Sequence, residues 1–340
     1  MREKKNLVSI ILTNYNRKKY LFDCLNSLLQ QTYSDIEIIY SDDASSDGSP
    51  DFVRANFPET KITVNKKNSG LSVTSNNGAR LARGEYLFFF NNDTIAFPDL
   101  VANLVRVIED KPDAAVASPV QLPYDSRLDE EWAKSRAQGF SACGTDIYGN
   151  PCPALSEEKM FYPDAAIFIK RKVFEEIGGF DPDLFLFGND IDICWRVHLL
   201  GYKIICADRA RFRHDSHSSQ IEDGKVLTSI RRRALVECSV ISMILKYYRI
   251  KTLLFILPTF SVLFAVEALF FLLFKFNHRL FIQVYIYAVV WNMKNLSRTL
   301  KKRSAIQKIR KVDDREIMKK MYFGYAKLDG VKRMGIPVIR

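Results

Sequence analysis

Three short polar segments contain the side chains of this chain that are best suited to chemistry, and each follows an apolar run. They are Thr13–Asn16, Ser41–Ser45 and Asn91–Thr94. Two of the segments contain carboxylates, Asp42, Asp43 and Asp93, which can accept hydrogen bonds or bind a divalent cation. A single polar segment after a strand is usually only a turn. Three such segments, two of them with carboxylates, favour a binding site.

Further acids, Asp190 and Asp192, lie much later in the chain. Either carboxylate could act as the general base that takes a proton from an attacking hydroxyl. Asp93 could bind Mg²⁺ or Mn²⁺ together with the phosphates of a ligand, because these cations take oxygen ligands. Simpler interpretations remain open, since Asp190 could merely cap a helix and Asp192 could pair with Arg196 one turn later.

The first half of the chain alternates strand-like and helix-like segments, which predicts an α/β fold with a parallel sheet covered on both faces. The expected strands are Leu7–Leu12, Ile36–Tyr40, Ile62–Val64 and Tyr86–Phe90, and the expected helices are Leu21–Leu29, Pro50–Asn56 and Ser72–Leu81. Ligands of such sheets bind at the carboxyl ends of the strands, which is where the polar segments lie.

The pattern is weaker between residues 110 and 160, where several prolines and glycines predict irregular structure that faces an acceptor. Regular periodicity then returns. The expected elements are a strand at Ala165–Ile169, a helix at Arg171–Ile177 ending at Gly178 and Gly179, a helix at Asp190–Leu200 and a strand at Tyr202–Cys206.

Two apolar stretches near the C-terminus indicate contact with a membrane. Thr252–Phe274 is long enough to span a bilayer, which takes roughly 20 residues, whereas Leu280–Trp291 is too short. Basic residues flank both stretches on every side, which fits a re-entrant or in-plane helical pair better than a span. A buried helical hairpin of a soluble oligomer is the alternative. If the membrane interpretation is right, deletion after Lys251 should release the protein from membranes.

The net charge of +11 arises largely from basic residues at Arg231–Arg233 and after Lys294. This grouping favours an anionic membrane surface over nucleic acid, since no nucleic-acid-binding module is visible. The cysteines form no Cys-x-x-Cys pair, so a zinc ribbon is unsupported. Cys24 and Cys194 fit core positions, and spacing alone leaves a Cys143–Cys152 bridge open. No secretory signal is visible, which predicts a cytosolic catalytic part.

A set of short strings resembles the family 2 glycosyltransferases with the GT-A fold, especially their rhamnosyltransferase-like branch. The strings are Val8–Arg17, Ser41–Ser49, Asn68–Gly70, Asn76–Gly78, Gly84–Thr94, Gly178–Asp181, Gly188–Asp192 and His214. Their order and spacing together are specific, and they cover roughly residues 7–248. The resemblance implies a mixed, mostly parallel sheet with helices on both faces, followed by the apolar helical segment.

The resemblance also implies roles for individual residues. The residues that would line the nucleoside pocket are Thr13, Tyr15, Asp42 and Asp43, and those that would approach the rest of the donor are Asn76, Arg80, Asn91 and Asn92. Asp93 would be the metal-binding carboxylate of the family's Asp-x-Asp element, with His214 as a further ligand and Asp215 or His217 as alternatives. Asp190 would be the catalytic base.

Two departures from the family pattern affect the expected chemistry. Asn91 replaces the first carboxylate of Asp-x-Asp, which predicts modest metal affinity. Asn189 replaces the first acid of the family's acidic pair, so Asp190 lacks a like-charged neighbour that would raise its pKa.

The resulting hypothesis is an inverting transfer of a single sugar from a dTDP- or UDP-sugar, dTDP-rhamnose among them, to a hydroxyl of a polyprenyl-diphosphate-linked glycan. The expected segments are a GT-A domain over 1–230, a basic connecting helix over 231–251, a membrane-associated apolar hairpin over 252–293 and a basic tail over 294–340. The expected location is the cytoplasmic face of the cell membrane. The alternatives are a processive polysaccharide synthase, which usually carries a Gln-x-x-Arg-Trp string that is missing here, and a non-catalytic nucleotide-sugar-binding module.

Overall fold

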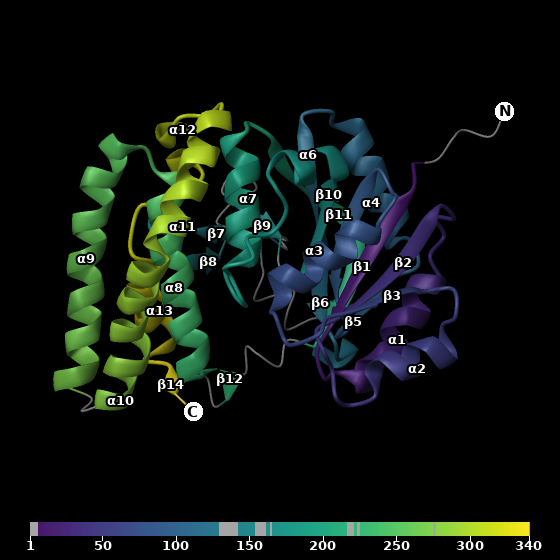
Figure 1. Cartoon of the computed structure of the whole chain (residues 1–340), viewed down its shortest axis with the longest axis horizontal. Coiled ribbons are helices and arrows are strands. Elements are labelled where there is room, and N and C mark those ends of the chain that lie inside the picture. The colour runs from purple at the N-terminus through teal and green to yellow at the C-terminus, as the bar shows by residue number, and fades with distance from the viewer. Residues whose placement is uncertain are drawn as a thin grey trace. The chain divides into compact units, whose positions relative to one another are not determined.

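The structure, a computed structural model, describes residues 6–128, 142–153, 161–163, 165–215, 221–222, 225–274 and 277–339 (Figure 1). The chain forms two compact units that are interleaved in sequence. Unit 1 comprises Met1–Cys143, Ala154–Phe185 and Tyr202–Ser216, and unit 2 comprises Gly144–Pro153, Leu186–Gly201 and His217–Arg340. The segments expected from the sequence run consecutively, and their division into domains stays a prediction.

Unit 1 is built on an eight-stranded sheet with the order β3-β2-β1-β4-β10-β6-β11-β5. The strands are β1 (Val8–Asn14), β2 (Ile36–Asp42), β3 (Lys61–Val64), β4 (Tyr86–Asn91), β5 (Thr94–Ala96), β6 (Ala114–Pro123), β10 (Ala166–Lys170) and β11 (Lys203–His214). Strand β1 pairs in parallel with β2 and β4, whereas β10 is antiparallel to β4 and β6, and β5 to β11. The predicted mixed, mostly parallel sheet is confirmed.

Helices cover both faces of this sheet because its central strands are apolar on both faces. They are α1 (Lys18–Leu29), α2 (Ser49–Asn56), α3 (Leu71–Leu81), α4 (Leu100–Asp110) and α6 (Arg171–Glu176), with a short turn of helix at η1 (Ser126–Leu128). Side chains alternate along a strand, so Ile10 and Phe88 join α1 and α4 in the main core. Ile11 and Phe89 point the other way, where Phe89 packs on Phe174 of α6.

The expected strands and helices are present, most of them with small shifts of their ends. Strand β11 runs on to His214, well past the expected end at Cys206, and the expectation for residues 110–160 was wrong in part. Strand β6 lies between β10 and β11 in the sheet and is mostly buried, although its many alanine, serine and proline residues weaken the apolar signal that marks the other strands. Further along, β7 (Ala142–Thr145) pairs with β9 (Tyr162–Pro163). All six cysteines are free thiols, so Cys143 and Cys152 are not bridged, and Cys24 and Cys194 are buried as predicted.

Unit 2 is mainly helical. Its helices are α7 (Asn189–Leu199), α8 (Ile230–Tyr247), α9 (Ile250–Leu273), α10 (His278–Leu280), the π-helix η4 (Phe281–Ile286), α11 (Tyr287–Ile309), α12 (Asp314–Lys319) and α13 (Ala326–Met334). Its strands are β8 (Pro151–Pro153), β12 (Ile221–Glu222), β13 (Lys225–Thr228) and β14 (Val338–Ile339). Helix α8 packs against α7, α9, η4 and α11, and is therefore central to this unit.

Helix α9 contains the first apolar stretch. It has 24 residues with a mean hydropathy of 2.2, and only 17% of its most apolar window is buried. By length and composition it is a candidate membrane span, and among the described helices it alone passes that test. The second apolar stretch falls on η4 and the first turns of α11.

Candidate active site

The three polar segments meet at one edge of the unit 1 sheet because their strands are parallel and in register. Asn14 at the end of β1 lies opposite Asp42 of β2, and Thr13 lies opposite Asn91 of β4. Loops at this edge contain two strained positions, since Asn16 and Ala44 have positive φ angles of 51° and 62°. Such backbone conformations are often found in functional loops.

A buried asparagine, Asn14, connects the ends of these strands. Its Nδ2 donates to Asp42 Oδ2 at 3.0 Å and to the Tyr40 hydroxyl at 2.9 Å, and its Oδ1 accepts from Asn92 Nδ2 at 2.5 Å. The side chain of Asn14, in the first polar segment, therefore bonds to the other two, through Asp42 and Asn92. The sequence indicated Asn14 only as part of a string, and the two-residue alternation of β1 gave no signal for this bridging role.

Asp42 and Asp43 are both buried, and their carboxylates accept hydrogen bonds from the backbone of the loops that follow β2 and β3. Asp42 Oδ1 accepts from the Ser45 amide at 2.7 Å. Asp43 accepts from the backbone amides of Ser69 and Gly70 at 2.7 and 2.8 Å. Both carboxylates thus bind their own chain already, and a contact with a nucleobase would be an additional hydrogen bond. The nucleoside role of these residues, and that of Thr13 and the half-exposed Tyr15, stays a prediction.

The structure brings Asp93 and His214 together although they are far apart in sequence. Strand β11 ends at His214, which pairs with Thr94 of β5, next to Asp93. His214 Nε2 lies 3.2 Å from Asp93 Oδ1, and the two side chains are 11% and 16% exposed. Arg17 approaches the other carboxylate oxygen at 4.0 Å. The predicted pair of metal ligands is therefore adjacent and accessible from solvent.

A divalent cation fits the chemistry of this pair. One carboxylate and one imidazole provide an oxygen and a nitrogen ligand that Mn²⁺ accepts, and other positions could be taken by phosphate oxygens of a donor. The described residues contain no group of three or more potential ligands from His, Cys, Asp or Glu. Asp215, one alternative ligand, accepts from the Tyr20 hydroxyl at 2.7 Å, and His217 lies outside the described residues.

Two residues near the Asp93–His214 pair, Tyr20 and Cys24, have raised pKa values. Burial, followed by the hydrogen bond to Asp215, raises the pKa of Tyr20, which keeps its hydroxyl protonated as a donor. Burial raises the pKa of Cys24 to about 12, so this thiol below the site is a packing residue and not a nucleophile.

The remaining donor-side residues are arranged less favourably for a ligand. Asn76 uses both ends of its amide on the backbone of Phe180, donating at 2.8 Å and accepting at 2.9 Å. Arg80 is exposed and donates to Asn77 at 2.6 Å. The predicted approach of Asn76 and Arg80 to the donor stays a prediction, and for Asn76 a contact with the donor would add to the two bonds that it already makes.

Asp190 and Asp192 differ sharply although both lie in the first turn of α7 in unit 2. Asp192 is fully buried, and its carboxylate binds Lys246, Tyr247 and, at 2.6 Å, Arg196. The pairing of Asp192 with Arg196 is the simpler interpretation offered by the sequence. Asp190 is only partly buried. Of the two acids, Asp190 is therefore the better candidate for a base that must meet a substrate.

The turn before Asp190 is fixed by α8. Phe187 and Gly188 have positive φ angles of 67° and 76°. Ser239 of α8 donates to the Phe187 carbonyl at 3.1 Å, and the Arg232 guanidinium lies 4.8 Å from the Phe187 ring centroid. The start of α7 therefore depends on contacts that the local sequence does not reveal.

The polar edge, with the Asp93–His214 pair and the loops after β1, β2 and β4, lies at the carboxyl ends of the strands, where α/β sheets of this kind bind their ligands. The glycosyl transferase family 2 model matches residues 9–179, about half of the chain, and includes all of these loops. The chain belongs to glycosyl transferase family 2.

Similar proteins are known among curated relatives and solved structures. The glucosyl-dolichyl phosphate glucuronosyltransferase of Haloferax volcanii is 26% identical over 219 residues, which cover 61% of this chain and 68% of that protein. Other curated glycosyltransferases match over shorter stretches, so that the chain spans only 33% and 40% of their length.

Two solved structures share the fold. A mannosyltransferase from Pyrobaculum calidifontis, in complex with GDP-Man and Mn²⁺, has a TM-score of 0.53 at 19% identity and covers 86% of this chain and 88% of its own. GalNAc-T7 with UDP, GalNAc and Mn²⁺ has a TM-score of 0.55 at 16% identity and covers 73% and 49%.

Proposed function

We propose that this chain is an inverting, metal-dependent glycosyltransferase that moves one sugar from a nucleotide-sugar donor to a hydroxyl of a lipid-linked glycan. The observation that carries the proposal is the Asp93–His214 pair, 3.2 Å apart at the edge of the sheet where the loops after β1, β2 and β4 meet. The family and the GT-A-like neighbours support the reaction class. The donor is a dTDP- or UDP-sugar, with dTDP-rhamnose the candidate from the branch that the sequence resembles.

Asp93 and His214 would hold Mg²⁺ or Mn²⁺ together with the donor diphosphate. When bound, the cation would neutralise charge on the leaving nucleoside diphosphate. The Mn²⁺ bound in two structural neighbours supports this assignment, and the single carboxylate of the pair, with Asn91 in place of a second, is consistent with modest affinity.

Asp190 would serve as the base. It takes the proton of the acceptor hydroxyl as that oxygen bonds to the anomeric carbon, while the bond from this carbon to the phosphate oxygen breaks and the nucleoside diphosphate leaves with the electron pair. Asp192 is an unsuitable base because its carboxylate is buried between Lys246 and Arg196.

A lipid-linked acceptor and attachment to the cytoplasmic face of the membrane complete the proposal. The helix of Asp190 belongs to the same compact unit as the apolar α9. A membrane-attached unit would bring the base to an acceptor held in the bilayer, such as a polyprenyl-diphosphate glycan. The relative named for a dolichyl phosphate substrate supports this class of acceptor.

The test is a panel of nucleotide-sugar donors with the full-length chain, with Mn²⁺ and with EDTA, read as release of nucleotide. Release from one donor that requires the metal is expected, followed by a mass increase of one sugar on a polyprenyl-diphosphate acceptor. A series of added sugars would instead indicate a processive synthase. If a donor binds but no donor is cleaved with or without metal, the chain is a non-catalytic binding module.

A further inference from the structure

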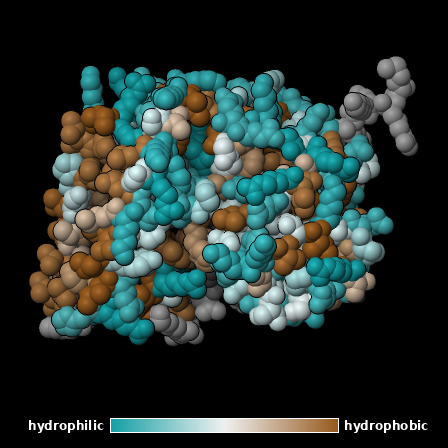
Figure 2. Space-filling model, viewed as in Figure 1, coloured by the Kyte–Doolittle hydropathy of each residue, from teal (hydrophilic) through white to brown (hydrophobic). Residues whose placement is uncertain are grey.

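An extended apolar surface lies on the outer side of unit 2, which we name the outer face. It includes Leu254, Val262, Val266 and Leu269 of α9, together with Ile282 of η4 and Met293 of α11. These side chains are exposed, Leu254 to 73% and Met293 to 69%. Figure 2 shows hydrophobic residues gathered over α9 at the left edge of the view. An exposed apolar surface of this kind marks an interaction site.

The opposite side of α9 is packed on the protein. Ile256, Phe260 and Phe264 recur at four-residue spacing and are buried, which places one stripe of the helix against its neighbours. Glu267, the acid that interrupts the apolar run, lies on this packed side with 16% of its side chain exposed. The helix is therefore apolar towards the outside and carries its single acidic residue towards the protein.

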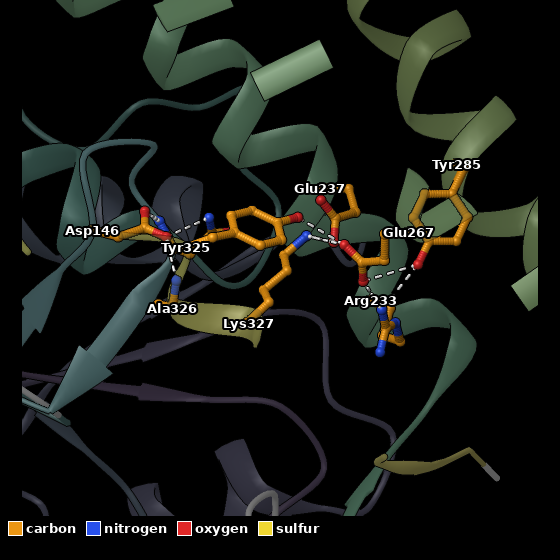
Figure 3. A network of polar contacts seen from close by, with 9 residues as sticks. Asp146, Arg233, Glu237, Glu267, Tyr285, Tyr325, Ala326 and Lys327 are labelled. Carbon is orange, nitrogen blue, oxygen red and sulfur yellow. Dashed lines mark hydrogen bonds and ion pairs between the residues drawn. The ribbon is translucent and has the colours of Figure 1, made fainter. Parts of the chain in front are cut away.

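Glu267 is part of a buried network that joins α9 to α8 and α13 (Figure 3). It accepts from Arg233 at 2.6 Å, from Lys327 at 3.2 Å and from the Tyr325 hydroxyl at 2.8 Å. Lys327 also donates to Glu237 at 2.5 Å. These bonds keep the polar helices α8 and α13 beside the C-terminal part of α9.

This packing argues against α9 crossing a bilayer. A helix of 24 residues is about 36 Å long, so a span would place most of its length, and the elements beside it, within hydrocarbon. Helix α13 carries the exposed Lys332 and Arg333, and α8 and α13 contribute the Arg233, Glu237 and Lys327 charges. Charged side chains are expensive at that depth. We therefore expect a membrane to meet the outer face.

We infer that the outer face lies in the plane of an anionic lipid bilayer, with its apolar side chains at the boundary of the acyl chains and no helix crossing the membrane. The inference deepens the proposed membrane attachment but does not depend on the proposed chemistry. Lys251, Lys294 and Lys301 are exposed on the same helices and match anionic head groups. A second copy of the chain is a poorer occupant, because these lysines would repel their counterparts.

The first experiment adds the full-length chain to preformed, sealed vesicles of phosphatidylcholine with or without phosphatidylglycerol, and measures cosedimentation without any donor or acceptor. Binding is expected to be stronger with phosphatidylglycerol and to fall with salt. The double variant Val262→Glu and Leu269→Glu should lower binding by at least about tenfold, because charges on an interfacial apolar face oppose burial. Val64→Glu on exposed strand β3 of unit 1 is the matched control and should bind like wild type.

The second experiment tests whether α9 crosses the bilayer. Single cysteines are introduced as Lys251→Cys and His278→Cys, two exposed positions near opposite ends of α9, and treated with an impermeant maleimide outside the vesicles. Both should label above the wild-type background without detergent. Protection of His278→Cys until detergent is added would mean that α9 spans and would overturn the inference.

The remaining outcomes are also decisive. Unchanged vesicle binding by the double variant, or no binding of the wild type to either vesicle, would contradict the inference. A wild-type dimer that becomes a monomer in the double variant, without lipid binding, would assign the outer face to a second copy. None of these results bears on the donor panel, so the chemistry and the membrane geometry can fail separately.

Discussion

At the scale of single residues, the carboxylates of this chain differ in what they already bind. Asp42, Asp43 and Asp192 are buried and accept hydrogen bonds from the protein itself. Asp93 and Asp190 are less buried, and Asp93 lies beside an imidazole. Since a catalytic acid must contact a substrate, this difference separates the proposed functional acids from the structural ones.

The exchange Asp190→Asn should leave donor binding and the unfolding temperature near wild type, but lower the rate of transfer by about 10²–10⁴, the range typical of general base catalysis. Donor titration, product assays and thermal unfolding measure these effects. Asp192→Asn is the contrasting variant. It removes the charge that compensates Lys246 and Arg196 and should cost about 3–5 kcal/mol of stability. Transfer at the wild-type rate by Asp190→Asn would assign the base to another residue.

Replacement of either member of the proposed metal pair, Asp93→Ala or His214→Ala, should weaken Mn²⁺-dependent donor binding by about tenfold or more, because the cation loses one of its few protein ligands. Calorimetric titration of donor with and without Mn²⁺ measures this effect. Tyr20→Phe removes a nearby hydroxyl that contacts Asp215 and should change metal dependence much less. Equal titration curves for wild type and both pair variants would refute the metal role.

At the scale of elements, strand register and helix packing bring these residues to their places. The parallel register of β1, β2 and β4 aligns the polar segments, and the antiparallel pairing of β11 with β5 places His214 at Asp93. Helix α8 fixes the turn at Phe187 and Gly188 that starts α7. The geometry of the acids therefore depends on elements that carry no catalytic residue.

The turn before α7 gives a prediction at this scale. In Gly188→Ala the new Cβ would lie 2.7 Å from Ser239 Cβ at a φ of +76°, so the turn must shift. We expect a stability loss of about 1–2 kcal/mol and a lower kcat with nearly unchanged donor affinity. Gly330→Ala in α13 meets no atom within 4 Å and should be neutral or slightly stabilising. Wild-type kcat in Gly188→Ala would show that the turn does not position the base.

The end of the sheet opposite the polar segments should respond to acid through Glu37, at the start of β2. Burial opposes ionisation of Glu37, but hydrogen bonds from Lys61, Ser9 and Arg83 outweigh it and lower the pKa from 4.5 to about 2. The ionised form stabilises the fold above pH 4.5, and this contribution disappears as the pH falls towards 2.

Urea unfolding at a series of pH values measures this dependence. Glu37→Gln should cost about 1 kcal/mol near neutral pH and flatten the decline between pH 4.5 and 2. Exposed Glu85→Gln is the control and should retain the wild-type slope. A slope in Glu37→Gln equal to that of wild type would contradict the assignment.

At the scale of the whole molecule, the two compact units are stabilised by different interactions. Unit 1 has a two-sided apolar sheet, whereas unit 2 contains buried ion pairs between helices distant in sequence. Burial of a charge is costly unless it is paired, so these contacts make unit 2 depend on residues up to α13. Asp146 accepts from the Ala326 amide at 2.9 Å and adds a further contact of this kind.

The exchange Lys327→Met tests this dependence, since it leaves Glu237 and Glu267 with one cation fewer in a buried site. We expect a loss of about 3–5 kcal/mol, measured by chemical unfolding of the full-length chain. Lys332→Met, on the same helix with an exposed side chain, should change stability by less than about 0.5 kcal/mol. Equal losses of stability in both variants would mean that the ion pairs of Lys327 do not contribute to the stability of unit 2.

The same contacts revise an expectation from the sequence. Deletion after Lys251 would remove α9, α11 and α13, which pack on α8, and α13 supplies the partner of Glu237. The truncated chain should therefore misfold instead of yielding a released soluble enzyme. Point variants on the outer face test membrane binding without removing the helices that pack on α8.

The sequence by itself determined the order of strands and helices from β1 to β4, and the three polar segments at the strand ends. It could do so because contiguous apolar runs, interrupted by glycine and polar turns, are local signals. Strand β6 was not predicted, because small residues that are buried on both faces of a sheet give no clear apolar run. The Asn91 and Asn189 departures were also visible, since they are matters of residue type alone.

Only the tertiary structure decided which acids are buried and which are partly exposed. The adjacency of His214 to Asp93, the burial of Asp192 against Lys246, and the inward side of α9 at Glu267 all join residues distant in sequence. Such contacts depend on how elements pack, and the free energy of a carboxylate depends on its neighbours in space rather than on its neighbours in the chain.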